Sequence, residues 1–302
     1  MGHNHSHSDN TLSGKNLLIS IVLNIIITIA QLIGGFISGS LALISDAVHN
    51  FSDVISLVIS YVANSLSKNK KQTKQYTFGY KRAEIIAAFI NAASLIVIAI
   101  FLAIEAVQRF NTSHEIKADL VIWLAILGIL ANGFSVLLLK KDANHNLNMK
   151  TAYLHLLSDM LTSVAVLIGG LLMKYYQLYW IDAVLTLLIS IYLMFLSWGI
   201  LITSLKILML FAPQEIVIDE VANEVLKVKE IKNIHHVHIW QLNEHDCHLE
   251  AHIEFNEDIK LSNFDVICEK IEKILLDKFH INHCNFQPEF KRDDLKELIK
   301  QD

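Results

Sequence analysis

The sequence predicts an α-helical membrane protein with six transmembrane helices, followed by a small soluble α+β domain. Apolar residues make up 53% of the 302 residues, and the chain has only two prolines, a composition more apolar than that of an average soluble domain. The apolar residues concentrate before Phe211, whereas the chain from Pro213 onward carries 20 Asp and Glu against 11 Lys and Arg. This change marks the boundary between a membrane domain and an acidic domain with a net charge of about −9.

We therefore divide the chain into three parts, of which the first is a short tail with three histidines. His3, His5 and His7 alternate with small polar residues, without the charged segment and apolar core of a signal peptide. A disordered tail is the simplest interpretation, and a tail that collects metal ions is the alternative. The tail, the membrane domain and the soluble domain are residues 1–15, 16–210 and 211–302.

Six apolar segments form the predicted membrane domain. Each is close to or longer than the roughly 20 residues that a helix needs to cross the hydrocarbon core. The connection Ser38-Gly39-Ser40 is so short that the first two segments are expected to form an antiparallel hairpin. The predicted spans are residues 17–37, 41–66, 83–110, 118–139, 151–173 and 180–205.

The distribution of positive charge predicts that both termini lie in the cytoplasm. The segments on the N-terminal side of the membrane carry 11 Lys and Arg, and the opposite loops carry three, an asymmetry that places the first side inside. The aromatic cluster from Tyr175 to Trp180 fits the opposite interface. The 11 residues are Lys15, Lys68, Lys70, Lys71, Lys74, Lys81, Arg82, Lys140, Lys141, Lys150 and Lys206, and the three are Arg109, Lys117 and Lys174.

The acidic C-terminal part is predicted to form a three-stranded sheet with two helices on one face. Apolar residues recur with helical spacing in two segments and alternate in three others. The order of these elements is α–β–β–α–β, which suits a two-layer α+β domain. The predicted helices are residues 214–229 and 262–278, and the predicted strands are residues 234–242, 248–255 and 283–289.

Charge and cysteine content narrow the partners and the compartment. The net charge of −5 gives no support to a nucleic-acid partner, which requires a basic surface. Cys247, Cys268 and Cys284 all lie in the soluble part and form no even framework. This usage fits a reducing compartment and argues against disulfides.

Two segments place a histidine and an aspartate four residues apart within an apolar span, and these residues form the main candidate site. His49 with Asp53, and His155 with Asp159, share one face of a helix at this spacing. Ionisable residues at membrane depth are costly and usually functional. Two imidazoles and two carboxylates make a four-coordinate shell suited to zinc. A polar helix–helix contact would explain one pair, but the repeat favours a membrane transporter for a divalent metal ion.

Other polar residues of the spans are interpreted more simply. Asp46 shares the face of His49 and is expected to be a second-shell or entry carboxylate. Glu105 and Arg109 are expected to pair with each other, and Asp182 to cap a helix. Helix–helix contacts are the expected role of Asn24, Gln31, Asn91, Asn132 and Ser135.

The soluble domain contains eight histidines, several of them on predicted strands. Alternation would put His236 and His238 on one face of the first strand, and His248 and His252 on one face of the second. Neighbouring strands could then present a metal-binding cluster, and solvated surface histidines are the alternative.

Three stretches of the sequence are informative together: Ser45-Asp46-Ala47-Val48-His49 through Asp53, Phe78-Gly79-Tyr80-Lys81-Arg82-Ala83-Glu84, and His155 through Asp159. They resemble the cation diffusion facilitator family, in its bacterial zinc/cadmium/cobalt-resistance branch. The resemblance covers essentially the whole chain. It implies a homodimer in the bacterial plasma membrane that exports Zn²⁺, with Cd²⁺ or Co²⁺ as further substrates, in exchange for protons. It also implies that residues 211–302 form a ferredoxin-like cytoplasmic domain for metal sensing and dimerisation.

The resemblance also implies the site residues. His49, Asp53, His155 and Asp159 match the transport site of the family, and a cytoplasmic regulatory site is matched by His238, His252, Asp265 and Glu289. Some members have a further site with histidines in the loop between spans two and three. This chain has Tyr76 and Tyr80 there, so we assign that loop no metal, and Gln287 stands where some members have a regulatory histidine.

The ligand set also favours a mechanism. Zinc binds neutral imidazoles and ionised carboxylates, and imidazole has a reference pKa of about 6.5, so protons compete with zinc near neutral pH. A membrane-anchored metal sensor is one rival class. An intramembrane metalloenzyme is the other, but it would need an open coordination position and a general base, whereas four side chains fill this shell. We therefore expect a transporter and not an enzyme.

Overall fold

The computed structural model describes residues 10–69, 74, 77–110, 115–140, 147–243 and 246–299, with side chains left undescribed in 10–18, 56–69 and 147–152. The three histidines of the N-terminal tail and Tyr76 lie outside the described residues. The chain divides into two compact units. The first comprises Met1–Tyr61 and Ile90–Leu201, and the second comprises Val62–Phe89 and Ile202–Asp302.

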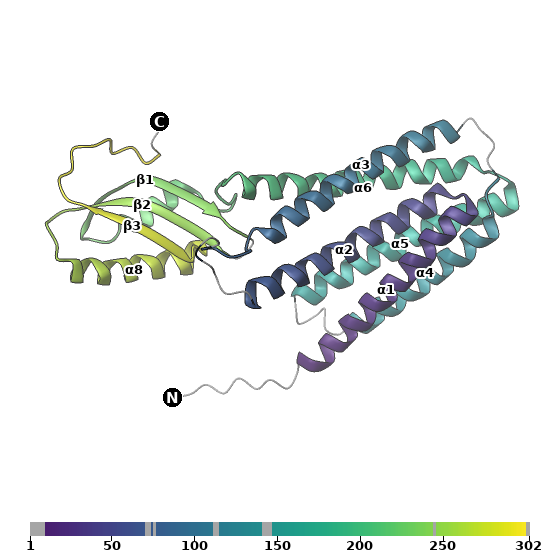
Figure 1. Ribbon diagram of the computed structural model, residues 1–302, viewed down its shortest axis with the longest axis horizontal. Helices are drawn as coiled ribbons and strands as arrows, with labels where there is room; N and C mark the ends of the chain where they lie inside the picture. The colour runs from purple at the N-terminus through teal and green to yellow at the C-terminus, as the bar shows by residue number, and fades with distance from the viewer. Residues whose placement is uncertain are drawn as a thin grey trace. The chain divides into compact units, whose positions relative to one another are not determined.

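Six long helices precede the C-terminal domain in the described residues. Neither proline lies in a helix, since one is at position 213 and the other at 288, and every backbone group within an uninterrupted helix finds its partner in the same segment. The helices, labelled in Figure 1, are α1 (Asn10–Ser38), α2 (Leu41–Asn69), α3 (Ala83–Arg109), α4 (Ala118–Leu139), α5 (Leu147–Tyr176) and α6 (Trp180–Leu208).

Five of these helices are long and apolar enough to cross a membrane, by length and composition. They contain the segments Ile19–Ser38, Ala83–Arg109, Ala118–Leu139, Tyr153–Tyr176 and Trp180–Leu208. The side chains of α2 are described only from Leu41 to Ile55, so the predicted span at residues 41–66 stays a prediction. The chain is therefore a helical membrane protein with five candidate spans among its described residues.

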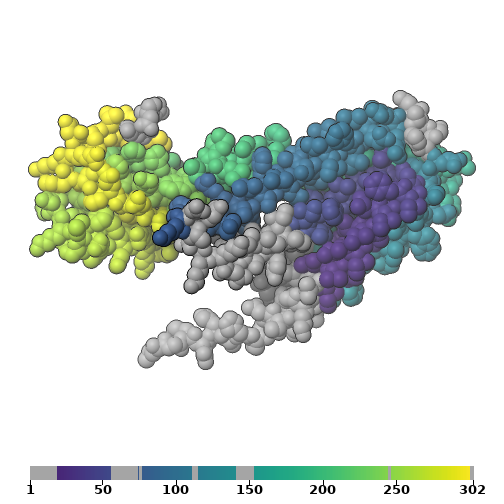
Figure 2. Space-filling view, in the orientation of Figure 1, coloured from purple at the N-terminus to yellow at the C-terminus, as the bar shows by residue number. Residues whose placement is uncertain are grey.

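Large apolar side chains cover the outer surface of these helices. The surface of α1, purple in Figure 2, carries the exposed side chains of Ile26, Ile33 and Phe36. Phe101 of α3 and Phe195 of α6 are exposed as well. A patch of this extent on a soluble protein would be an association site, whereas on a membrane protein these side chains face lipid.

Polar contacts hold the turn between α1 and α2. Gly39 adopts a φ of +77°, which glycine tolerates because it has no Cβ. The Ser40 hydroxyl and the Leu41 N–H donate to the two carboxylate oxygens of Asp182, at 2.5 and 2.8 Å. Asp182 is therefore a helix cap, as predicted, although it belongs to α6 and caps the start of α2. Such N–H groups have no partner within their own helix.

The predicted pair of Glu105 and Arg109 is confirmed. The Arg109 Nε lies 2.8 Å from the Glu105 carboxylate, and another Arg109 nitrogen donates to the Gly39 carbonyl oxygen at 2.8 Å. The pair therefore ties α3 to the same turn that Asp182 caps.

The C-terminal domain contains a three-stranded sheet. The strands are ordered β1-β2-β3; β1 pairs with β2 antiparallel and β2 pairs with β3 parallel. Pro288 lies on edge strand β3, where its missing N–H interrupts no central ladder. The elements, in the predicted order, are α7 (Ile218–Val225), β1 (Ile231–Gln241), β2 (Cys247–Phe255), α8 (Leu261–Phe279) and β3 (His283–Glu289).

Helix α7 is shorter than the predicted segment 214–229. Asp219 and Glu220 occupy its first turn, where carboxylates favour a helix start. Val228, beyond the helix, is buried in the same core, and Ile216, before it, packs partly against that core. The helical spacing of apolar residues therefore extends beyond both ends of α7. Such spacing indicates which side chains are buried, and it does not show where the backbone is helical.

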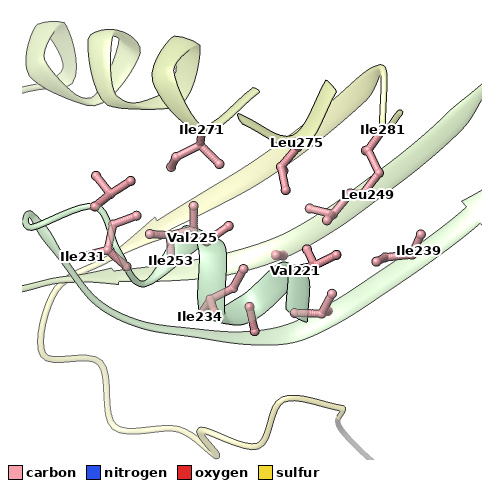
Figure 3. Close-up of a cluster of buried hydrophobic side chains, with 14 of the residues drawn as sticks. Val221, Val225, Ile231, Ile234, Ile239, Leu249, Ile253, Ile271, Leu275 and Ile281 are labelled. Atoms are coloured by element: carbon pink, nitrogen blue, oxygen red, sulfur yellow. The ribbon is translucent and has the colours of Figure 1, made fainter. Parts of the chain in front are cut away.

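Both helices contribute to the apolar core of this domain. Figure 3 shows side chains of α7 and α8 gathered with those of the strands. The Lys278 Nζ of α8 lies 2.8 Å from the Glu224 carboxylate of α7, which places the helices beside each other on one face of the sheet. The core includes Val221, Val225, Ile231, Ile234, Ile239, Leu249, Ile253, Ile271, Leu275 and Ile281.

A β-bulge interrupts β1 at its histidines. The register with β2 shifts between His235 and His238, and His236 has a φ of +52°. A bulge inserts an extra residue and re-aims the side chains around it. His235 is consequently buried opposite His252.

We predict that Asp182→Ala destabilises the helical unit by about 2 kcal/mol, because the start of α2 loses its cap. The melting temperature of the detergent-solubilised protein, followed by tryptophan fluorescence, should fall by about 5 °C. Asp182→Asn should recover about half of this loss, since asparagine caps helices well. Asp119→Ala, on the exposed first turn of α4, is the control, and an equal loss in this variant would contradict the role of the cap.

Candidate metal sites

The structure brings the two predicted His/Asp pairs together between α2 and α5. His49 lies 3.5 Å from Asp53 of its own helix and 3.6 Å from Asp159. His155 lies 3.6 Å from Asp159 of its own helix and 3.2 Å from Asp53. Each imidazole therefore contacts both carboxylates, and the two rings are 5.9 Å apart between centroids. Ligand atoms of His49, Asp53 and Asp159 all lie within 4.8 Å of one another, and His155 adjoins this group.

One side of this cluster is much more buried than the other. The side chains of Asp159 and His49 are 0% and 3% exposed, whereas those of Asp53 and His155 are 26% and 37% exposed. Both Asp159 carboxylate oxygens and His49 Nδ1 are buried without a hydrogen-bond partner, and Asp53 Oδ2 is contacted by His155 Nε2 at 3.2 Å. Buried polar atoms in this state are costly. A cation bound among them would satisfy them, so the donor set fits a metal ion.

Asp46 does not join the cluster but anchors the helix that carries His49. Its carboxylate accepts hydrogen bonds from Thr162 at 2.8 Å and from Gln31 at 3.0 Å, and lies 3.4 Å from the Ser163 hydroxyl. Gln31 also accepts a bond from Asn50 at 3.3 Å, so its predicted helix–helix role is confirmed. Asp46 thus connects α2 to α1 and α5 about one helical turn from His49, and its predicted role beside the metal ligands stays a prediction.

Close packing by α4 completes this polar network. A Cβ on Gly128 would lie 2.9 Å from Gln31 Nε2 and 2.9 Å from Ser163 Oγ, too close without rearrangement. Thr162 and Ser163 were not predicted, because the sequence does not indicate which distant residue a hydroxyl group on an apolar helix will bond to.

Helix α6 also borders the cluster. The Tyr192 ring lies 6.3 Å from the His49 ring between centroids, edge to face, and its hydroxyl is 3.3 Å from that of Ser158. Tyr192 was not predicted, since a single tyrosine in an apolar helix is usually a packing residue. In the structure it restricts how the His49 ring can turn.

A second cluster lies in the C-terminal domain. It consists of His235 on β1, His252 on β2, Glu289 on β3 and Asp294 on the following segment, with ligand atoms within 4.8 Å of one another. His252 Nδ1 lies 2.9 Å from Glu289 Oε1, and His235 Nε2 lies 3.2 Å from Glu289 Oε2. Gln287 donates to Glu289 at 3.0 Å.

Of the four residues expected in a regulatory site, this cluster contains His252 and Glu289. His238 pairs with Glu250 in the strand register, and Asp265 lies exposed near the start of α8. Neither belongs to the described group. Sequence reasoning missed His235, because the bulge reverses the alternation, and Asp294, because the chain folds back after β3.

Basic side chains accompany the acidic residues of the second cluster. Lys296 Nζ lies 3.0 Å from Glu289 Oε2, and an Arg292 nitrogen lies 3.1 Å from Glu289 Oε1. Burial opposes ionisation of Glu289, but the hydrogen bond and positive charge of Lys296 outweigh it and hold the pKa of Glu289 below its ordinary value. Glu289 is therefore an ionised carboxylate in a largely buried position.

Comparison with known proteins finds the same family over both parts of the chain. A family model described as the cation efflux transmembrane domain matches residues 17–209. Another, described as the cation efflux protein cytoplasmic domain, matches residues 213–290.

Curated relatives match over nearly the whole chain. A cadmium, cobalt and zinc/H(+)-K(+) antiporter of Bacillus subtilis is 34% identical over 291 residues, which cover 96% of this chain and 92% of the relative. The metal cation efflux system protein CzcD of Cupriavidus metallidurans is 33% identical, with 95% and 90% covered. The zinc transporter ZitB of Escherichia coli is 32% identical, with 96% and 93% covered.

We predict that Asp46→Ala weakens Zn²⁺ binding at the membrane cluster by about tenfold, the lower end of the effect of removing a group that supports metal ligands, because α2 loses its bonds to Gln31 and Thr162. Asp46→Asn should lose less, because its amide oxygen still accepts from Thr162. Equilibrium dialysis of the detergent-solubilised protein measures the affinity, with Asp119→Ala as the control. Unchanged binding in Asp46→Ala would show that the network does not position the cluster.

Proposed function

Because this chain belongs to the cation efflux, or cation diffusion facilitator, family, we propose that it exports divalent metal cations across a membrane in exchange for protons. The observation that carries this proposal is the cluster of His49, Asp53, His155 and Asp159, whose buried atoms lack hydrogen-bond partners. These residues lie on two long helices of an integral membrane protein. Ionisable residues within membrane spans commonly mark ion pathways, which supports a role for this cluster in moving an ion across the membrane.

The proposed substrate is Zn²⁺. Two imidazoles and two carboxylates suit a tetrahedral zinc shell, whereas Mg²⁺ or Mn²⁺ would suit an all-oxygen set better. Relatives named for cadmium, cobalt and zinc support Cd²⁺ and Co²⁺ as further substrates. The metal ion here is cargo, so the cluster must release it as well as bind it.

Protons provide a means of release. Zinc requires neutral imidazoles and ionised carboxylates, so each proton taken up by the cluster weakens metal binding. His49 and His155 are the proposed proton carriers, since imidazole titrates near neutral pH. A relative named as an H(+)-K(+) antiporter supports proton exchange. In this conformation, the more exposed side formed by Asp53 and His155 is the proposed way into the cluster.

The proposed membrane topology has six spans, which are the five candidate spans together with α2. The positive-inside rule places both termini in the cytoplasm, and the plasma membrane of a bacterium is the proposed location. Residues 1–15 form the tail, 16–210 the transport domain and 211–302 a ferredoxin-like cytoplasmic domain. The match of residues 213–290 to the family's cytoplasmic domain supports this assignment and a homodimer.

A regulatory metal site in the C-terminal domain is the second part of the proposal. His235, His252, Glu289 and Asp294 would hold the ion there, since they offer two imidazoles and two carboxylates within 4.8 Å. His238 and Asp265 stay predictions of the sequence. A membrane-anchored sensor without transport is the alternative function, and ion flux through a purified protein separates the two.

We predict that Asp159→Ala abolishes Zn²⁺ flux, because the most buried ligand is lost and the shell is incomplete. The measurement is Zn²⁺ uptake into proteoliposomes loaded with a fluorescent indicator, under an imposed pH gradient. Asp119→Ala is the control, and gel filtration establishes that both variants fold and insert. Wild-type flux in a folded Asp159→Ala protein would rule out the four-ligand site.

A second prediction concerns direction and coupling. Cells that express the protein should accumulate less zinc than cells that express Asp159→Ala, and dissipating the pH gradient should slow export. The measurement is cellular zinc content after addition of a protonophore. Export that ignores the proton gradient but follows a K⁺ gradient would point to potassium as the driving ion instead.

A further inference from the structure

The segment after β3 folds back onto the bulge of β1. This segment, residues 291–299, lies beyond the residues that match the family's cytoplasmic domain, which end at 290. The His236 N–H donates to the Glu297 carbonyl oxygen at 3.1 Å, and the Val237 N–H donates to the Leu298 carbonyl oxygen at 2.8 Å. Two backbone hydrogen bonds therefore hold the segment over the C-terminal cluster.

The fold-back brings the Lys296 ammonium group into the cluster. Its Nζ contacts the Asp294 carboxylate, lies 3.0 Å from Glu289 Oε2 and lies 3.5 Å from His235 Nε2. An ammonium group can only donate hydrogen bonds, and here it lies beside two carboxylates and one imidazole nitrogen of the cluster. The same nitrogen and the same carboxylate oxygens would coordinate a metal ion. Lys296 therefore occupies the position of a cation.

The charges of the cluster already balance without a metal ion. Glu289 and Asp294 contribute two negative charges, and Lys296 and Arg292 contribute two positive charges within ion-pair distance of them. The Glu289 side chain is 1% exposed and that of Lys296 is 27% exposed, so water screens this pair only in part. A divalent ion beside the ammonium group would be repelled, and the two cations cannot share the site.

We propose that Lys296 is a tethered cation that competes with divalent metal for the C-terminal cluster, and that metal binding releases residues 296–299 from β1 while Asp294 stays with the metal ion. This inference rests on the proposed function of the cluster as a regulatory metal site. The segment sets the metal concentration at which that site fills. Zinc must displace Lys296, so the site stays empty at low zinc although its ligands are already assembled.

The first test measures zinc affinity after removal of this charge. Full-length protein carrying Asp53→Ala and Asp159→Ala, which silence the membrane cluster, is compared with the same protein carrying Lys296→Gln. The substitution removes the charge and leaves a polar side chain that is one atom shorter. Equilibrium dialysis with Zn²⁺ should give an affinity roughly tenfold tighter, the effect of removing one partly buried competing charge.

Lys291→Gln is the matched control. Lys291 lies in the same segment, is exposed, and stacks on the Phe290 ring with its Nζ 5.0 Å from the centroid. This variant changes the net charge of the protein by the same amount as Lys296→Gln. Its zinc affinity should stay unchanged, because Lys291 points to the Phe290 ring and not to the cluster. His252→Ala in the same background should abolish the binding, which assigns it to the cluster.

The second test needs no substitution at Lys296 and therefore stands if that variant fails to fold. Hydrogen exchange is followed in full-length protein with the silenced membrane cluster, with and without Zn²⁺. Zinc should speed exchange of the His236 and Val237 amides, because they lose Glu297 and Leu298 as acceptors. In Lys296→Gln the same amides should exchange faster even without zinc.

The outcomes separate the inference from the function on which it rests. One result would overturn the tethered cation and leave the regulatory site standing. In that result zinc binding requires His252 but is equally tight in Lys296→Gln and Lys291→Gln, and zinc leaves amide exchange at His236 and Val237 unchanged. Absence of any His252-dependent zinc binding would overturn the regulatory site, and the inference with it. Transport through the membrane cluster is unaffected by either result.

Discussion

The constraint on which the membrane domain depends is the burial of the Asp159 carboxylate. Its side chain is fully buried, and neither oxygen has a hydrogen-bond donor. Among the residues with described side chains, no Lys or Arg forms an ion pair with the cluster of His49, Asp53, His155 and Asp159. A carboxylate in this position must be neutralised by a proton or by a bound cation. Exchange between these two is the chemistry that the proposed antiport requires.

The surrounding structure keeps the ligand-bearing helices in place while the cluster itself stays unsatisfied. Asp182 of α6 caps the start of α2, and Asp46 fastens the same helix to Gln31 and Thr162. These contacts are fully paired, so they stabilise the packing around α2. Both oxygens of Asp159 are buried in the cluster without a hydrogen-bond partner, and a bound cation would satisfy them.

The two clusters differ in how the negative charge of their carboxylates is balanced. Both combine two imidazoles and two carboxylates, but the C-terminal cluster contains cations from its own chain, Lys296 and Arg292. A metal ion would complete the membrane cluster, whereas in the C-terminal cluster it would have to replace a charge that is already present. A transporter benefits from both arrangements, since cargo must be bound readily and a regulatory ion only above a threshold.

The sequence by itself determined that each histidine shares a helix face with its aspartate, and it predicted the order of the C-terminal elements. Both follow from local periodicity, because spacing along a helix or strand fixes which side chains lie together. Only the tertiary structure decided that the faces of α2 and α5 meet, that Asp46 bonds to Thr162, and that His235 and Asp294 join His252 and Glu289. A bulge and a fold-back are set by contacts between distant segments, and no local pattern encodes where such segments meet.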